Sequence, residues 1–144
     1  MAFKKYSVGF AFDEQGKNVV LIKKNRPQWQ RGLLNGVGGH IEKNEGPHAA
    51  QAREFKEETG VETYDSNWAL FAILSGEDYE LNCFSIFTNE IFYVKTTTDE
   101  DIRIYPVSDL RILATIPNLQ WLIPAALDKH FHNSKLLIRE ELNG

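Results

Sequence analysis

Glutamates are concentrated in one short stretch, and their spacing suits metal chemistry. Glu54, Glu57 and Glu58 stand at positions i, i+3 and i+4, so on a helix they share one face. Ala49, Ala52 and Phe55 are expected on the opposite face. Three carboxylates within one turn repel each other unless a cation compensates their charge. Mg2+ takes oxygen ligands and commonly bridges substrate phosphates, so the spacing indicates a metal site for phosphate chemistry. The alternative is an acidic helix face that only contacts water.

The residues around these glutamates favour the metal site. Gly38 and Gly39 lack side chains, so backbone carbonyls there can approach an ion closely. Glu45 adds a fourth carboxylate just before the expected helix. Arg53, next to Glu54, can orient a carboxylate through its fixed fork of N–H donors.

The same stretch resembles the Nudix box of the Nudix hydrolase family. The family signature is Gly, five residues, Glu, seven residues, Arg-Glu, an apolar residue, any residue, Glu-Glu, any residue, Gly and an apolar residue. The matching residues here are Gly39, Glu45, Arg53, Glu54, Phe55, Glu57, Glu58, Gly60 and Val61. The only departure is Phe55, where an aliphatic residue is more usual. The stretch Asn35–Gly39 is similar to members that act on oxidised purine triphosphates.

The resemblance implies an enzyme that cleaves a diphosphate linkage with Mg2+, for which Mn2+ can substitute. It implies metal ligation by Glu54, Glu57, Glu58 and the Gly38 carbonyl. Catalysis would then depend on Glu57, Glu58 and Arg53, and Arg53 with Glu45 would hold the loop against the helix.

A further carboxylate from a later loop is often present in the family. The candidate is Glu100 in the acidic loop 98–101, as general base or extra ligand. Glu77 and Asp78 are weaker candidates. An alternative is that the acids of these loops only contact water.

The resemblance implies substrate contacts at Lys23, Asn35, Gly39 and Asn118. Strand alternation sends Lys23 and its neighbour Lys24 to opposite faces, so only one faces the site. The amides of Asn35 and Asn118 can read a purine edge, since each offers a donor and an acceptor. The alternatives are turn formation for Asn35 and helix capping for Asn118.

Three aromatic residues, Trp29, Phe84 and Trp121, can stack on a base, but core packing is the favoured interpretation for each. His40 follows the glycines and is a lesser candidate for substrate contact. No histidine pair has the context of a zinc site, and His130 and His132 are expected at the surface.

The order of expected strands and helices predicts an α/β (α+β) fold, in which a mixed sheet is sandwiched between helices, as in the Nudix fold. One domain over residues 1–144 is expected. The clearest helix is 47–59, with Pro47 in its first turn and Gly60 at its end. A second helix is predicted over 119–130, kinked or shifted by Pro124. Strands are expected at 6–12, 18–23, 68–75, 79–87, 91–94 and 102–107, and 134–142 is ambiguous.

Composition places the chain among cytoplasmic globular proteins. The net charge of −4 argues against binding long nucleic acid, and no apolar run is long enough to span a membrane. The single cysteine, Cys83, cannot form an internal disulfide and is expected in the core. The expected partner is a small nucleotide, and a homodimer is possible.

Three functions are compatible with the box. A hydrolase of a nucleoside triphosphate or related diphosphate leads, with modified dNTPs ahead of nucleotide sugars, dinucleoside polyphosphates and capped RNA ends. A non-catalytic nucleotide sensor is second, but such domains commonly lose box glutamates. A Nudix-like isomerase of isoprenoid diphosphates is third and would need an active-site cysteine, whereas Cys83 lies within an expected strand.

Overall fold

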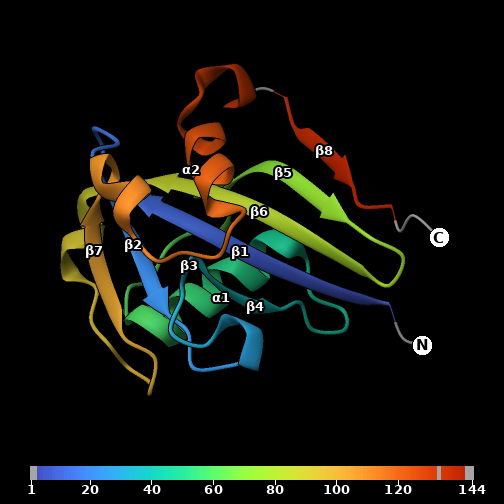
Figure 1. The fold of residues 1–144 in the computed structure, drawn as a ribbon, viewed down its shortest axis with the longest axis horizontal. Helices are drawn as coiled ribbons and strands as arrows, with labels where there is room; N and C mark the ends of the chain where they lie inside the picture. Colours follow the sequence, from blue (N-terminus) through green and yellow to red (C-terminus); the bar gives the residue numbers. More distant parts are fainter. Residues whose placement is uncertain (1–2, 133, 142–144) are drawn as a thin grey trace.

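A mixed sheet of eight strands separates two α-helices, one on each face (Figure 1). The computed structural model describes residues 3–132 and 134–141. The strands are β1 (Lys4–Phe12), β2 (Asn18–Lys23), β3 (Leu34–Asn35), β4 (Val37–His40), β5 (Ala69–Ser75), β6 (Tyr79–Phe87), β7 (Ile102–Pro106) and β8 (Leu136–Arg139). The helices are α1 (Pro47–Thr59) and α2 (Leu119–Leu127), with short 3-10 helices η1 (Gln28–Gln30), η2 (Asp65–Asn67), η3 (Asn89–Tyr93), η4 (Val107–Ile112) and η5 (Lys129–His132). The predicted fold class is confirmed.

The long strand β1 organises the sheet. It pairs in parallel with β6 along its whole length, and antiparallel with β4 and β2 on its other side. β5 continues the sheet from β6, and β8 adds a parallel edge strand to β5. The opposite edge is β7, which is antiparallel to β2. This arrangement places β4, which carries the paired glycines, next to the centre of the sheet.

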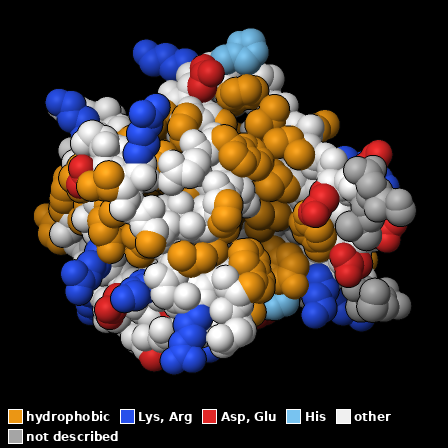
Figure 2. Space-filling view, viewed as in Figure 1, with side chains coloured by type: hydrophobic (Ala, Val, Ile, Leu, Met, Phe, Trp, Pro, Cys, Tyr) orange, Lys and Arg blue, Asp and Glu red, His pale blue; other side chains and the backbone are white. Residues whose placement is uncertain are grey.

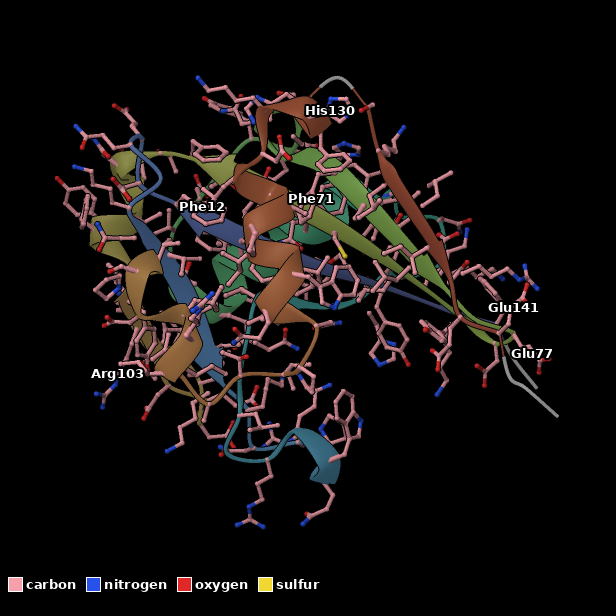
Figure 3. The ribbon with its side chains drawn as sticks, turned by 45° about the horizontal axis from the view of Figure 1, so that its top comes forward. Phe12, Phe71, Glu77, Arg103, His130 and Glu141 are labelled. Carbon is pink, nitrogen blue, oxygen red and sulfur yellow. The ribbon has the colours of Figure 1, made fainter. Side chains whose placement is uncertain are left out.

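Alternation along β1 supplies two separate cores. Phe10 and Phe12 point to the face covered by α2, whereas Ala11 points to the face covered by α1. Figure 3 shows Phe12 and Phe71 on the α2 side of the sheet. On the other side, Phe55 of α1 is 1% exposed and packs edge-on against Trp68, with ring centroids 5.2 Å apart. Phe55 is therefore the anchor that fixes α1 on the sheet.

The helix α1 has the predicted bounds. Pro47 occupies its first turn, and Gly60 ends it in the left-handed region with φ of 78°. The predicted packing face, with Ala49, Ala52 and Phe55 opposite the glutamates, is only partly right. The fully buried side also includes Gln51, because Gly9 of β1 has no side chain to exclude its amide. The packed side thus lies nearer to the glutamates than the sequence indicated.

Several other elements differ from the prediction. Residues 91–94 belong largely to η3 and not to a strand, and α2 stops at Leu127 where the expected helix ran to 130. Pro124 lies inside α2 without ending it. The glycine-rich stretch forms β3 and β4, which were not predicted, because β1 and β2 supply pairing partners that local sequence does not reveal. The ambiguous C-terminal segment contains β8 at residues 136–139; residues 142–144 lie outside the described ranges.

No α-helix within the described ranges has the length and apolarity that crossing a membrane requires.

Candidate active site

Arg53 is the centre of the candidate site and connects α1 to the loop that precedes it. Its Nε and Nη2 donate to the two carboxylate oxygens of Glu45, at 2.7 and 3.0 Å, and Nη2 also donates to the His40 carbonyl at 3.1 Å. Its Nη1 lies 3.0 Å from Glu54 Oε1 and 3.3 Å from Glu57 Oε1. One guanidinium therefore holds the loop and orients two of the three helix carboxylates.

Glycine is required on β4 because the glutamate side chain lies against the backbone there. A Cβ added to Gly39 would lie 2.6 Å from Glu54 Oε1, closer than real side chains approach. A Cβ on Gly38 would lie 2.0 Å from the Ser7 carbonyl oxygen of β1. The two glycines thus let β4 approach β1 and bring the Glu54 carboxylate directly onto β4.

The charge of Glu54 is not fully compensated by the protein. Burial raises its pKa, Arg53 opposes this shift, and the neighbouring carboxylates of Glu57 and Glu58 raise it further. Its side chain is 14% exposed, whereas that of Glu57 is 56% exposed. A divalent cation beside Glu54 would remove both the desolvation and the repulsion, so the donor set fits such an ion.

The three carboxylates are not gathered around one point. Across residues 3–132 and 134–141, no three acidic, histidine or cysteine side chains converge closely enough to hold a metal ion. The reason is visible at Arg53, whose Nη1 occupies the space between Glu54 and Glu57. Ligation by these residues stays a prediction, as does ligation by the Gly38 carbonyl, and it requires the side chains of Glu54 and Glu57 to turn from Arg53 toward the ion.

Glu58 is oriented by a loop distant in sequence. The hydroxyl of Thr98 donates to Glu58 Oε2 at 3.1 Å, and the same hydroxyl accepts the Glu100 N–H at 3.2 Å. The Thr97 hydroxyl donates to the backbone carbonyl of Glu57. The acidic loop is thereby tied to the last turn of α1.

Glu100 is close to the site but already has partners. It is 4% exposed, its Oε1 lies 3.0 Å from Lys24 Nζ, and its Oε2 accepts the Asn25 N–H at 2.6 Å. Arg26 of the same β2–β3 loop pairs with Asp99. The loop was correctly singled out as a neighbour of the box, while the role of Glu100 as base or ligand stays a prediction.

Comparisons with known proteins identify this arrangement. The model of the NUDIX domain matches residues 4–135. The chain belongs to the NUDIX domain family. Comparison with curated protein sequences gives no match. The identified family and the intact box make the chain a Nudix hydrolase, as the sequence predicted.

Solved structures with the same fold are Nudix proteins of low sequence identity. A MutT structure from work on Aliivibrio salmonicida and Vibrio cholerae is 16% identical with a TM-score of 0.72, covering 85% of this chain and 96% of that one. The mutator MutT protein of Bacillus halodurans is 19% identical with a TM-score of 0.69, covering 95% and 90%. The MutT NUDIX hydrolase of Burkholderia pseudomallei is 15% identical with a TM-score of 0.71, covering 87% and 98%.

The two lysines at the end of β2 lie on opposite faces of the Nudix sheet, as alternation predicts. Lys24 forms an ion pair with Glu100 of the acidic loop. The same loop contacts α1 through the hydrogen bond from Thr98 to Glu58. Lys23 is exposed and pairs across the ladder with Leu34, whose side chain belongs to the α2 core. Phosphate contact by Lys23 stays a prediction, and the geometry adds Lys24 as the lysine nearer to the box.

The two asparagines assigned to base recognition lie on segments that are paired through one bridge in the Nudix domain. Leu34, the neighbour of Asn35, bridges Thr115, three positions before Asn118. Asn35 donates to Gln30 Oε1 at 3.2 Å and accepts the Gly36 N–H at 2.8 Å, which gives it a role in the turn. Asn118 precedes α2 in helical conformation and its side chain makes no capping bond. Helix capping is therefore not what Asn118 does.

Exposed aromatic side chains correct one interpretation. Trp29 is 64% and Trp121 41% exposed, so neither is a core residue, whereas Phe84 is fully buried as expected. Figure 2 shows hydrophobic side chains gathered across the middle of the α2 face. Partly buried leucines at positions 74, 81 and 136 pack against the core on that side. An apolar surface is thus available beside α2, on the face opposite the box helix.

The lesser candidates lie away from the box or are inert. Glu77 lies at the end of the β5–β6 hairpin, in the same region as Glu141 (Figure 3). His130 is exposed at η5, as predicted, and no zinc cluster exists within the described residues. Cys83 is fully buried and burial raises its pKa to about 12, which confirms a core cysteine. Sequence reasoning missed Thr98 and Gln51, because both act through contacts that no local spacing encodes.

Proposed function

We propose that this Nudix domain hydrolyses a diphosphate linkage in a nucleoside triphosphate or related nucleoside diphosphate derivative, with Mg2+ as cofactor. The observation that carries the proposal is the position of the Glu54 carboxylate. It is largely buried against Gly39, and this burial, together with two neighbouring carboxylates, raises its pKa. Such an arrangement is unfavourable for a protein alone and favourable around a divalent cation.

Different residues of the site would bind the cation and fix the geometry of the loop and the helix. Glu54, Glu57 and Glu58 would hold the cation, and Mn2+ would substitute for Mg2+. When bound, the cation supplies charge neutralisation on the phosphates and lowers the pKa of water. Arg53 and Glu45 keep the loop and the helix in one geometry, which contributes by positioning.

Water attacks one phosphorus, and the anhydride P–O bond breaks with its electron pair leaving on the departing phosphate. The proton of the water needs an acceptor at the site. Glu100 is our candidate for this general base, with the condition that its carboxylate first releases Lys24. Lys24 would then be free to contact a substrate phosphate. Breaking the Lys24–Glu100 ion pair would therefore both free Glu100 to accept the proton and free Lys24 to bind the phosphate.

Oxidised purine dNTPs are the first substrates to test. Asn118 supports this choice, since it directly precedes α2 and its amide makes no capping bond. Asn35, on the other side of the Leu34 bridge, would add a second amide. An amide pair suits a purine edge that presents both donors and acceptors.

The experiment is a phosphate-release screen with Mg2+ and added pyrophosphatase. The panel comprises 8-oxo-dGTP, the ordinary dNTPs, ADP-ribose and dinucleoside polyphosphates, with Glu58→Gln as the control. Mg2+-dependent turnover that is lost in the control supports a hydrolase, and the best substrate defines its class. Turnover that continues in the presence of excess chelator would contradict the metal dependence.

A non-catalytic sensor is the second candidate. It predicts calorimetric binding of a nucleotide without product formation by a folded protein. The complete set of box glutamates argues against it. Nucleotide sugars and dinucleoside polyphosphates are the alternative substrates within the hydrolase class.

A cytoplasmic location and a possible homodimer complete the proposal. Fluorescence of a tagged full chain in its own cell tests the first. Light scattering of the purified protein at several concentrations tests the second, with a constant monomer mass as the contrary result.

A further inference from the structure

The three box glutamates on α1, Glu54, Glu57 and Glu58, differ in what orients them. Glu54 and Glu57 both receive hydrogen bonds from Arg53, which belongs to the box itself. Glu58 receives its hydrogen bond from Thr98, forty positions further along the chain. The family signature therefore accounts for the orientation of two carboxylates and leaves the third to a loop outside it.

The direction of the Thr98 hydrogen bond is determined by its neighbours. A hydroxyl has one proton to donate and lone pairs to accept. The Glu100 N–H, 3.2 Å away, can only donate, so it uses a lone pair of the Thr98 oxygen. An ionised Glu58 can only accept, so the single hydroxyl proton points to its Oε2 at 3.1 Å. This leaves Glu58 Oε1 without a hydrogen bond among the described residues.

The hydroxyl is held in place from its other side. Glu100 is buried and its carboxylate accepts the Asn25 N–H at 2.6 Å, which anchors the backbone from which Thr98 is positioned. The adjacent Thr97 fixes the same loop to the backbone carbonyl of Glu57. Thr98 thus connects the Glu58 carboxylate to a rigid point on the β2–β3 loop.

We propose that Thr98 is a positioning residue for the metal site, which orders the Glu58 carboxylate so that one oxygen is held by the hydroxyl and the other is left for the cation. The inference rests on the proposed function, because it assumes that Glu58 is a ligand. It assigns a role to a residue that the box does not contain. Groups that hydrogen-bond to a metal ligand without touching the metal typically contribute about 10–100-fold to metal affinity or activity.

The test compares Thr98→Val, which removes the hydroxyl and keeps the shape, with Thr98→Ser, which retains the hydroxyl. The control is Thr115→Val, which removes a hydroxyl that donates to the Ile116 backbone carbonyl, outside the box and the acidic loop. Mn2+ binding is measured by electron paramagnetic resonance on the full chain without nucleotide, and thermal unfolding is measured in the same samples. Thr98→Ala provides a second removal of the hydroxyl.

We expect Thr98→Val and Thr98→Ala to weaken Mn2+ binding about tenfold, with Thr98→Ser and Thr115→Val close to wild type. Wild-type affinity in both variants that lack the Thr98 hydroxyl would overturn the positioning role, as would an equal loss in Thr115→Val. Failure of Thr98→Ser to restore binding would also overturn it. If the wild type itself bound no Mn2+ and hydrolysed nothing in the nucleotide screen, the proposed function would fall, and this inference with it.

Discussion

Arg53 binds both carboxylate oxygens of Glu45, with Nε 2.7 Å from Oε2 and Nη2 3.0 Å from Oε1. The pair closes the loop between β4 and α1, because Glu45 Oε1 also accepts the Glu42 N–H at 3.0 Å. The hydrogen bonds from Arg53 lower the pKa of Glu45, against the opposing effect of burial. Stability from this pair is therefore present above the ordinary glutamate pKa and is lost as the pH falls through the lowered value.

Replacing Arg53 by lysine should separate charge from geometry. Lysine keeps the positive charge but cannot form the bidentate pair with Glu45, so we expect a 10–100-fold loss of kcat/KM in the nucleotide assay. Arg103→Lys is the matched control, because Arg103 is exposed on the edge strand β7 (Figure 3). Equal activities of the two variants would show that the fork of Arg53 is dispensable.

The box glutamates should be essential to turnover and dispensable for folding. We expect Glu57→Gln and Glu58→Gln each to lower kcat by about 100-fold or more, since each removes a charge from the proposed cation site. The melting temperature without metal should change by no more than about 5 °C, because neither side chain is part of the core. Near-wild-type turnover in either variant would refute the metal assignment.

Gly39→Ala should displace the Glu54 carboxylate, because it adds a single Cβ atom beside it. The new Cβ would lie 2.6 Å from Glu54 Oε1, so the carboxylate must move from its place on β4. We expect weaker Mn2+ binding and about tenfold lower activity. Gly46→Ala serves as control, since a Cβ there meets nothing within 4 Å. Indistinguishable Mn2+ affinities in the two variants would contradict the proposed contact.

Asn118→Ala should alter the choice of base and leave stability unchanged. Its side chain makes no capping bond, so the melting temperature should stay within about 2 °C of wild type. The ratio of kcat/KM for 8-oxo-dGTP over dGTP should fall, whereas the enzyme should still cleave the diphosphate linkage of the nucleotides tested. An equal loss on every nucleotide tested would show that Asn118 does not read the base.

Cys83 should be unreactive in the native protein. Burial raises its pKa to about 12, so almost no thiolate exists near pH 8, and the fully buried sulfur is out of reach of reagents. A chromogenic disulfide reagent should react with Cys83 only after denaturant is added. Fast reaction of the folded protein would mean that the thiol is accessible and that the core assignment is wrong.

Local sequence was sufficient for the elements that carry strong signals of their own. The helix 47–59 has a proline at its start and a glycine at its end, and the structure has the same bounds. Residues 79–87 follow the turn residues Gly76, Glu77 and Asp78 and form β6 as predicted. The segment 91–94 is apolar but forms a 3-10 helix, because the Thr88 hydroxyl accepts the Glu90 N–H and starts a turn. Apolar composition alone did not distinguish these two outcomes.

The sequence by itself determined the family, the fold class and the ligand candidates, because the box encodes its chemistry in spacings within one turn of helix and one adjoining loop. Only the tertiary structure decided which partners orient those ligands. Thr98 reaches Glu58, Lys24 reaches Glu100, and Gly39 admits Glu54, through contacts between segments that are far apart in the chain or separated by a turn. Such contacts depend on how β1 pairs with β4 and how α1 packs on the sheet, and no local pattern records that geometry.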